Sequence, residues 1–467
     1  MSTFKKSAIN LLAITTLILL IQKTNAQTNK SAQMDSLIHR ANHLGLFNGN
    51  ILIAENNKVI YKNAVGFADA AGKIKLTEQY RFHIGSIAKE FNAVGIMILK
   101  EQGKLSLEDP VSKYLPELPA WASKIHIINL LQYTSGIPDV KWKSVKSNAE
   151  NMEDLKKTTQ LDFEPGSQYA YNNNNVFLQR RIIEKITGLS FTAFTEKYLL
   201  KPCGMKTAIV DPVATDKLIA RAYNNDHVED ELTYPINGWV AVTLDDFYKW
   251  VNAITNFKLI SPASTKQILE PAGPNQQAGL GGGMMEANRV ITHKHDGTAR
   301  NYQALLVSTV SKGRTVILMT NNQQNNLYTF DVSIQAILDG KPYTQIKKSV
   351  LGAFGKQIEQ MDGPEVITFY EKMKKDYNNE YSFDAEATLN EIGYNFLRQN
   401  KFRDAILVFE QNTKLFPESG NVFDSLGEAY YKQGDKGKAL LNYKKSVVLN
   451  PENGDAKKII AELSSKF

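Results

Sequence analysis

The sequence predicts an α+β domain over residues 27–345, followed by an all-α module over 386–467. Segments with strand character stand at both ends of the first region with helical segments between them, and the C-terminal region repeats itself every 34 residues. Residues 346–385 are then expected to form a helical linker. A chain of 467 residues is long enough for several domains with buried cores.

Composition narrows the class of protein. Hydrophobic residues make up 43% of the chain and charged residues 22%, as in an ordinary globular protein. This excludes a chain dominated by disorder, collagen or coiled coil, and the single long apolar run excludes a multispan membrane protein. The one cysteine, Cys203, excludes an intramolecular disulfide framework and a metal site built on cysteines. We expect Cys203 to be a packed small hydrophobic residue.

The first 26 residues are typical of an export signal. Lys5 and Lys6 precede an apolar stretch over 8–21, too short for a membrane span, and Ala26 is the small residue before the expected cleavage site. An uncleaved anchor is the alternative. Cleavage would leave no stable membrane span, and the loss of Lys5, Lys6 and Lys23 would lower the net charge from +7 to +4. So small a charge does not favour nucleic-acid binding, and export without disulfides favours a bacterial periplasm or exterior.

The first region is predicted to hold strands near both of its ends. Residues 51–54 and 59–61 form a hairpin pattern, and later strands are predicted over 290–292, 304–309 and 315–320. We expect the first and last strands to share one sheet, which makes the domain α+β.

Two helices are predicted between these strands. A helical apolar period runs over 87–102 and stops at Gly103. Another runs over 176–186 and stops at Gly188.

The C-terminal region repeats at a fixed offset of 34 residues. Five residues and their counterparts carry the repeat: Gly393, Phe396, Ala405, Phe409 and Pro417, and then Gly427, Tyr430, Ala439, Tyr443 and Pro451. Small residues let two helices cross closely, aromatic residues fill the gap and proline ends the second helix. This is the tetratricopeptide pattern, with units over 386–419 and 420–453 and a capping helix over 457–467. Such a module either binds a protein partner or packs as a purely structural element.

Ser86 and Lys89 are spaced so that their side chains share one face of a helix. A lysine whose pKa is lowered can take the proton of a nearby serine hydroxyl, and the free N–H groups at a helix start favour an anion. Taken alone, the spacing favours a helix-capping serine and a solvated lysine.

Two later segments add polar side chains. Tyr171 could relay a proton beside a lysine, although the run 172–175 of asparagines would by itself indicate a turn. His295 and Gly297 precede a predicted strand, where a glycine would let a substrate lie against the strand edge. By themselves they indicate a turn with a surface histidine.

In order and spacing, the three segments resemble the class C β-lactamase-like serine hydrolases of the β-lactamase and penicillin-binding protein superfamily. That family has Ser-x-x-Lys, Tyr-x-Asn and often His-x-Gly motifs, which stand here at 86–89, 171–173 and 295–297. The segments 130–138 and 165–166 are similar to further family motifs. The resemblance covers about 45–340 and implies a β-lactamase/transpeptidase-like fold: an antiparallel sheet flanked by helices, with a helical subdomain.

The resemblance implies a role for each of the first motif residues. Ser86 would be the nucleophile that is acylated, and Lys89 and Tyr171 would act together as base and proton shuttle. Asn173 would bind a substrate amide or carbonyl. Tyr169 is a rival for the tyrosine role, but an asparagine in register after Tyr171 favours the latter.

The third motif would complete the site. His295 would stand where other members have lysine, Gly297 would keep the strand edge open, and the backbone N–H of Thr298 would form an oxyanion hole with that of Ser86. The resemblance implies no cofactor and no metal. A metal reading of the segment 293–296 is disfavoured, because its aspartate comes one position early and the last histidine of the metallohydrolase pattern is missing.

Departures from the family bear on the substrate. Asn172, Tyr133 and the residues after Gly297 differ from the usual pattern. Because histidine is mostly neutral at pH 7, His295 favours a peptidase or esterase acting on D-amino-acid peptides or small esters over efficient hydrolysis of β-lactams. The alternative is a non-catalytic scaffold whose repeats bind a protein partner.

Overall fold

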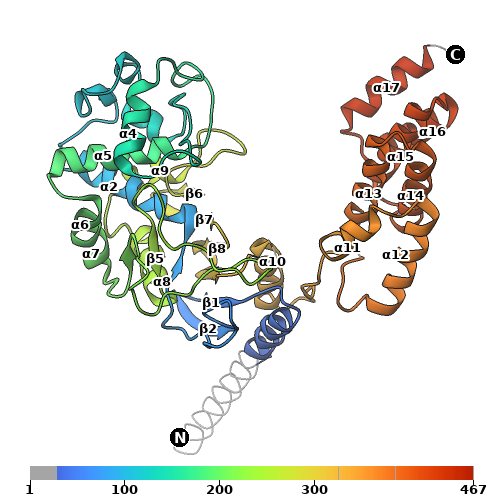
Figure 1. Ribbon diagram of the computed structural model, residues 1–467, viewed down its shortest axis with the longest axis horizontal. Helices are drawn as coiled ribbons and strands as arrows, with labels where there is room; N and C mark the ends of the chain where they lie inside the picture. Colours follow the sequence, from blue (N-terminus) through green and yellow to red (C-terminus); the bar gives the residue numbers. More distant parts are fainter. Residues whose placement is uncertain (1–28, 324–325, 384, 466–467) are drawn as a thin grey trace, which may run out of the picture. The chain divides into compact units, whose positions relative to one another are not determined.

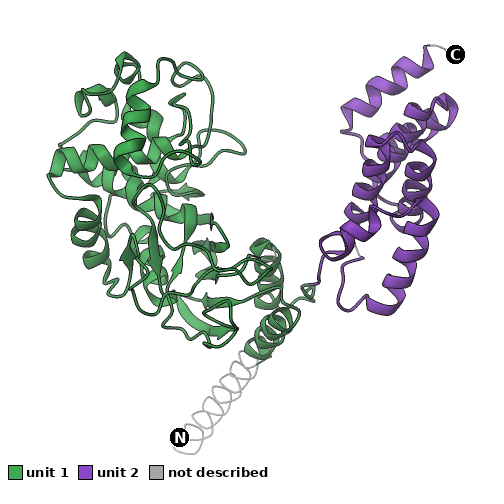
Figure 2. Ribbon diagram, viewed as in Figure 1, with its two compact units in different colours: residues 1–346 green, residues 347–467 purple. Residues whose placement is uncertain are grey.

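The computed structural model describes residues 29–323, 326–383 and 385–465. They form two compact units that meet between Ile346 and Lys347 in the sequence (Figure 2). The predicted export signal over 1–26 lies outside the described residues. Within the described ranges, no helix combines the length and the apolar composition that crossing a bilayer requires.

Unit 1 is built on a six-stranded antiparallel sheet of order β2-β1-β9-β8-β7-β6 (Figure 1). Its strands are β1 (Gly49–Glu55), β2 (Lys58–Val65), β6 (Gly282–Glu286), β7 (Arg289–Ala299), β8 (Tyr302–Thr309) and β9 (Arg314–Thr320). β1 and β2 form the predicted hairpin. β1 also pairs with β9, Gly49 opposite Thr320. The prediction that the first and last strands share one sheet is confirmed.

The central strands are apolar on both faces because both faces are covered. Successive side chains of a strand point to opposite faces. Leu52 of β1 belongs to the core that contains Phe91, whereas its neighbour Ile51 belongs to the core that contains Leu37 and Phe330. These strands therefore read as continuous apolar runs rather than as an alternating pattern.

Helices cover the two faces of this sheet, as the predicted α+β class requires. The α-helices of unit 1 with assigned bounds are α2 (Lys89–Glu101), α3 (Ile127–Leu131), α4 (Asn148–Lys157), α5 (Asn173–Thr187), α6 (Phe191–Thr195), α7 (Lys201–Cys203), α8 (Leu244–Thr255), α9 (Pro262–Leu269) and α10 (Leu327–Leu338). A further helix covers 29–43. Shorter helical turns are η1 (Gly85–Ala88), η2 (Val111–Lys113), η3 (Ala120–Ser123), η4 (Glu196–Leu200) and η5 (Val310–Lys312). Cys203 is buried, as predicted.

A small second sheet positions two segments that will matter for the site. It has the order β3-β5-β4, with β3 (Phe82–His83), β5 (Val240–Val242) and β4 (Ile209–Val210). β3 leads directly into η1, and β5 directly follows the segment 234–239. Because β3 and β5 are paired, η1 and the 234–239 segment are held close together.

Unit 2 is all-α over its described residues. Its helices are α11 (Val350–Ile358), α12 (Gly363–Tyr377), α13 (Ala387–Arg398), α14 (Phe402–Leu415), α15 (Gly420–Gln433), α16 (Lys436–Leu449) and α17 (Gly454–Ser464). Val350 of α11 and Tyr370 of α12 share one core with Phe409 and Tyr443. The segment 346–385, expected to be a linker, therefore contributes two helices to the core of this unit.

Equivalent glycines let paired helices of unit 2 cross closely. A Cβ atom on Gly393 would lie 2.5 Å from the ring of Phe409, and one on Gly427 would lie 3.1 Å from the ring of Tyr443. The four residues come from corresponding positions of the two sequence repeats. The helix pairs α13–α14 and α15–α16 are thus built on the same plan, and their assignment as tetratricopeptide units stays a prediction.

Candidate active site

Ser86 and Lys89 stand on consecutive turns of one continuous helical segment. Ser86 lies in η1 and Lys89 begins α2. The Nζ atom of Lys89 donates a hydrogen bond of 2.8 Å to the Oγ atom of Ser86. The spacing of the two residues thus puts amine and hydroxyl in direct contact, the geometry that proton transfer between them requires.

Burial lowers the proton affinity of the Lys89 amine. The residue is 5% exposed and forms no ion pair with any described carboxylate. The pKa of the Lys89 amine is lowered to about 7, mainly by burial and to a smaller extent by the positive charge of Arg180. The negative charge of Asp139 opposes this shift. A substantial share of the amine is therefore neutral at neutral pH and can accept a proton.

Tyr171 completes a group of three. It immediately precedes the helix cap Asn172, whose side chain accepts a hydrogen bond from the backbone of Asn175 at the start of α5. The centre of the Tyr171 ring lies 4.9 Å from the Nζ atom of Lys89. Burial raises the pKa of the Tyr171 hydroxyl, and its hydrogen bond with Ser86 opposes this rise.

Tyr169, the sequence rival, is held elsewhere. Its hydroxyl accepts a hydrogen bond of 3.0 Å from the backbone N–H of Gln277. Between the two tyrosines, it is Tyr171 that lines the cavity described next.

A cavity of about 390 Å³ opens over the three side chains. It is lined by Ser86, Lys89, Trp142, Tyr171, Asn173, Tyr234, Pro235, Trp239, Thr298, Ala299 and Arg300. Five of these were predicted as site residues from the sequence: the serine, the lysine, Tyr171, Asn173 and Thr298. The aromatic walls come from Trp142, Tyr234 and Trp239, which the sequence did not single out.

Gly297 lies where β7 meets η1, the turn that carries Ser86. A Cβ atom on Gly297 would lie 2.1 Å from the carbonyl oxygen of Ile84 and 2.8 Å from the backbone nitrogen of Ser86. A Cβ atom on Gly85 would lie 2.5 Å from the backbone nitrogen of Thr298. The two glycines therefore permit a contact that leaves the N–H groups of Ser86 and Thr298 on adjoining segments at the cavity.

His295 lies inside β7 and does not line this cavity. Its Nδ1 atom is 2.8 Å from the Oε1 atom of Glu90, and the Nε2 atom of His293 is 2.9 Å from the same oxygen. Trp250 donates a hydrogen bond of 2.6 Å to the other carboxylate oxygen. Burial would raise the pKa of Glu90, but the two histidines lower it to about 2. The imidazole is thus engaged in a buried cluster around Glu90, next to Lys89 on α2, and substrate contact by His295 remains a prediction.

Asp296 points to the opposite face of β7 from its histidine neighbours. Its carboxylate accepts a hydrogen bond of 3.0 Å from the hydroxyl of Tyr328. The segment 293–296 therefore does not gather its side chains around one point. Over the described residues, no group of three or more His, Cys, Asp or Glu side chains is arranged to hold a metal ion.

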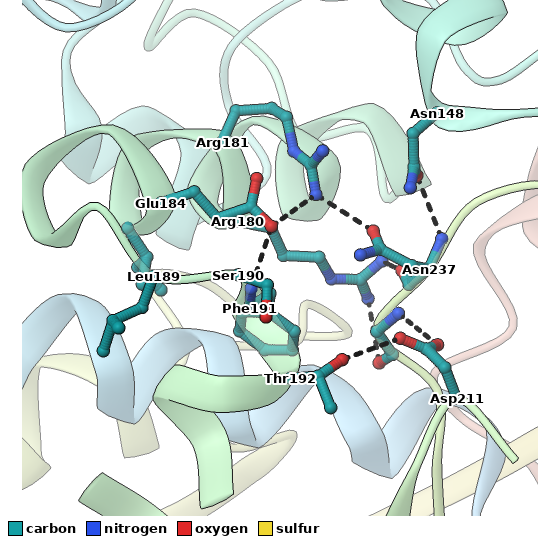
Figure 3. Close-up of polar contacts among 12 residues, drawn as sticks. Asn148, Arg180, Arg181, Glu184, Leu189, Ser190, Phe191, Thr192, Asp211 and Asn237 are labelled. Carbon is teal, nitrogen blue, oxygen red and sulfur yellow. Dashed lines mark hydrogen bonds and ion pairs between the residues drawn. The ribbon is translucent and has the colours of Figure 1, made fainter. Parts of the chain in front are cut away.

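Two arginines beside the site were not found from the sequence. Arg300 lines the cavity, and its guanidinium lies 4.6 Å from the centre of the Tyr234 ring and donates to the carbonyl of Thr233. Arg180 is buried on α5 beneath the 234–239 segment (Figure 3). Arg180 lies on α5 and Arg300 directly follows β7. Each meets residues of the segment 233–239 only through tertiary contacts, which local spacing does not predict.

Comparison with known proteins identifies relatives of unit 1. The family model described as Beta-lactamase matches residues 34–337. Penicillin-binding protein 4* of Bacillus subtilis (strain 168) is 26% identical over 353 residues, covering 68% of this chain and 77% of that protein. Protein flp of Staphylococcus aureus (strain MW2) is 26% identical over 321 residues, covering 63% of this chain and 64% of its own length.

Solved structures show the same fold. A class C beta-lactamase superposes with a TM-score of 0.57 at 21% identity and covers 68% of this chain and 98% of its own. A penicillin-binding protein from Bacillus halodurans gives a TM-score of 0.56 at 21% identity, covering 64% of this chain and 97% of its own. The family match stops at 337, so unit 2 lies outside it. The chain belongs to the beta-lactamase family, the family of serine β-lactamases and penicillin-binding proteins.

Proposed function

We propose that this protein is an exported serine hydrolase that cleaves amide or ester bonds through an acyl-enzyme on Ser86. The observation that carries the proposal is the contact of the Ser86 hydroxyl with the buried, partly neutral amine of Lys89 at the floor of a cavity. A retained scaffold without activity would have no need to keep a lysine buried at such a cost.

Acylation follows from the positions of the three side chains. The neutral amine of Lys89 accepts the proton of Ser86 as Oγ attacks the substrate carbonyl carbon. A C–O bond to Ser86 forms, and the bond from the carbonyl carbon to the leaving nitrogen or oxygen breaks. The proton passes from Lys89 to the leaving group, with the Tyr171 hydroxyl as relay. Water then attacks the acyl-enzyme, releases the acid and restores the Ser86 hydroxyl.

The backbone N–H groups of Ser86 and Thr298 are the proposed oxyanion hole. Donors of this kind stabilise the negative charge that develops on the carbonyl oxygen, each typically by about 3 kcal/mol. Asn173, at the first turn of α5, is the proposed ligand of a substrate amide or carbonyl, since it lines the same cavity.

The proposed substrates are D-amino-acid peptides, small esters or β-lactams, with preference for the first two. His295 is turned to Glu90 and supplies no cation to the cavity. Capture of a substrate carboxylate by the histidine of the third motif is therefore disfavoured, and the guanidinium of Arg300 is the arginine charge that lines the cavity. A panel of nitrocefin, short-chain nitrophenyl esters and D-alanyl peptides ranks the three classes.

Covalent labelling tests the proposal. The mature protein is incubated with a fluorescent penicillin and, separately, with a fluorophosphonate, and the adduct is located by mass spectrometry. We expect an adduct on the peptide that contains Ser86, absent in Ser86→Ala and retained in Ser167→Ala, a serine exposed on a nearby loop. Absence of labelling by both probes, with partner binding unchanged in Ser86→Ala, would support the scaffold alternative.

Export is a separate part of the proposal. It rests on the N-terminal sequence pattern and on the bacterial origin of the relatives named above. N-terminal sequencing of the protein recovered from outside the cytoplasm is expected to begin at Gln27. A chain that retains Met1 in the cytoplasm would contradict export.

We also propose that unit 2 binds a peptide or helical segment of a protein partner. The close helix crossings at Gly393 and Gly427 support a repeat module, the class of fold that presents such a surface. Crosslinking of the full chain in cells, followed by mapping of the crosslinked residues, is expected to place the partner on unit 2; crosslinks confined to unit 1 would contradict this.

A further inference from the structure

Arg180 is a buried cation with neutral partners. It is 3% exposed, and its Nε atom donates a hydrogen bond of 2.8 Å to the side-chain oxygen of Asn92 on α2. Its terminal nitrogens donate to the carbonyls of Asn237 and Gly238, the latter at 3.3 Å (Figure 3). Burial lowers the pKa of Arg180 to about 10, so it remains charged at neutral pH. An arginine buried without an ion pair is costly, which calls for a physical reason.

The contacts of Arg180 hold the wall of the cavity. Residues 234–239 place Tyr234, Pro235 and Trp239 in the lining. Gly238 in this segment has φ +97°, and its Cα lies so close to the guanidinium that a Cβ atom would be 2.2 Å from the Cζ atom of Arg180. The segment therefore sits directly on the arginine.

A carboxylate fixes the same segment from its other side. Asp211 accepts hydrogen bonds from the backbone N–H groups of Gly238 at 2.5 Å and Trp239 at 3.0 Å. The hydroxyl of Thr192 donates to Asp211 at 3.5 Å. The wall is thus held by a cation that binds its carbonyls and by an anion that binds its N–H groups.

The charge of Arg180 also acts on Lys89, the proposed base. After burial, it is the largest influence that lowers the pKa of Lys89, and the opposing charge is that of Asp139. Tyr171 faces Lys89 from the start of α5. Glu90, next to Lys89 on α2, is turned to the two histidines of β7.

The charged groups around Arg180 have opposing effects on its pKa. Asp211, Glu184 and Tyr133 favour its charged form, and Arg181 disfavours it. Arg181 has its own partners, Glu184 at 3.1 Å and the side chain of Asn237 at 3.0 Å. Arg181 therefore offers a matched cation on the same helix that does not act on Lys89.

We propose that Arg180 is a positioning residue of the hydrolase: it clamps the 234–239 wall and, through its hydrogen bond to Asn92, fixes a permanent positive charge against the helix turn that carries Lys89. This inference rests on the proposed acyl transfer. The same guanidinium would then link the shape of the cavity wall to the protonation of the base.

The test compares pH profiles of Ser86 labelling by the penicillin or fluorophosphonate probe that modifies it. In Arg180→Met we expect the acidic limb of the profile to move up by about one pH unit, which lowers the rate at pH 6 by about tenfold and leaves it closer to the parent at pH 9. Arg180→Lys retains the charge and is expected to leave the limb in place while weakening substrate binding, because the fork to the two carbonyls is lost. Arg181→Met is expected to leave the limb in place.

A direct titration of Lys89 separates this inference from the proposed function. In protein carrying ¹³C-lysine, the Lys89 signal is identified by its absence in Lys89→Met and titrated in the parent and in Arg180→Met. A higher midpoint in Arg180→Met supports the inference even if no probe labels Ser86; equal midpoints overturn it even if labelling succeeds. If Arg180→Met does not fold, Arg180→Gln, which keeps amide donors for the carbonyls but removes the charge, is expected to raise the midpoint, and an unchanged midpoint there overturns the inference as well.

Discussion

At the scale of single residues, the site stores an unfavourable interaction. Lys89 is held in a buried position where its amine loses much of its affinity for a proton, its pKa falling from 10.5 to about 7. An unfolded chain would keep this lysine charged throughout that interval. The folded state therefore gains stability relative to the unfolded state as the pH rises from about 7 towards 10.5, because the unfolded state binds more protons there.

Replacing Lys89 by methionine is therefore expected to abolish labelling of Ser86 while stabilising unit 1. The expected gain at pH 7 is about 2–4 kcal/mol, since each unit of pKa shift corresponds to about 1.4 kcal/mol. Urea unfolding at pH 7 and pH 9.5 should show a smaller gain at the higher pH. A variant that is less stable than the parent at pH 7 would contradict this account of the site.

Glu90, in contrast to Lys89, is a buried group whose charged form is stabilised by its hydrogen-bond partners. Its carboxylate receives hydrogen bonds from three side chains, and its pKa is lowered from 4.5 to about 2. Its contribution is fully present above pH 4.5 and is lost as the pH falls towards 2.

Substitution of Glu90 by glutamine is expected to destabilise unit 1 by about 3 kcal/mol at pH 7. The difference from the parent should shrink as the pH falls from 4.5 towards 2, measured by thermal or urea unfolding. Glu108→Gln, an exposed control, should change stability little. A pH-independent difference would mean that the charge of Glu90 is not what its partners stabilise.

At the scale of elements, the site depends on how closely β7 approaches η1. The glycine at 297 leaves room for the carbonyl of Ile84 and the amide of Ser86. A side chain at this position must push the strand away from the turn that carries Ser86, and displacements of an ångström at the proposed reacting centre would be costly.

Gly297→Ala is accordingly expected to lower the rate of Ser86 labelling by about a hundredfold or more. Gly282→Ala, in neighbouring β6, is the matched control, since its nearest new contact would be an ordinary 3.7 Å from Pro271. Equal labelling rates in the two variants would show that the contact between strand and turn does not set the geometry of the oxyanion hole.

Local patterns predicted the elements well where one face or one spacing dominates. The hairpin at 51–61, the helices that became α2 and α5, and the shared sheet of the first and last strands were all readable from periodicity and turn residues. Ser86 and Lys89 were identifiable because their contact lies within one helical turn.

Local sequence patterns could not predict the other residues around the site. Glu90 looks like a solvated helix residue, but every residue of α2 from Lys89 to Leu99 is buried. The uninterrupted apolar run over 93–99 was the available signal that this helix has no solvent face. Arg180 and Trp239 meet the site only through contacts between distant segments, which no local pattern reports.

At the scale of the whole molecule, the two units have separate hydrophobic cores. The buried residues of unit 2 form one cluster, and those of unit 1 form two others. We therefore expect two distinguishable unfolding transitions.

Gly393→Ala is expected to destabilise the unit 2 transition by about 1–3 kcal/mol, because the new Cβ would lie 2.5 Å from the Phe409 ring. Ser86 labelling and the unit 1 transition should not change. Gly437→Ala, whose nearest new contact is 3.7 Å away, is the control and should be close to neutral. Simultaneous loss of both transitions in Gly393→Ala would show that the units fold as one body.

The pairing of β1 with β9 constrains how this protein can be made. During synthesis β1 leaves the ribosome long before β9, its partner in the sheet, because β9 is encoded near the end of unit 1. Until Thr320 has emerged, β1 and β8 each expose an open edge that could pair with another chain. A polypeptide interrupted before that point is expected to aggregate, and translation must run through β9 before the proposed active site can form.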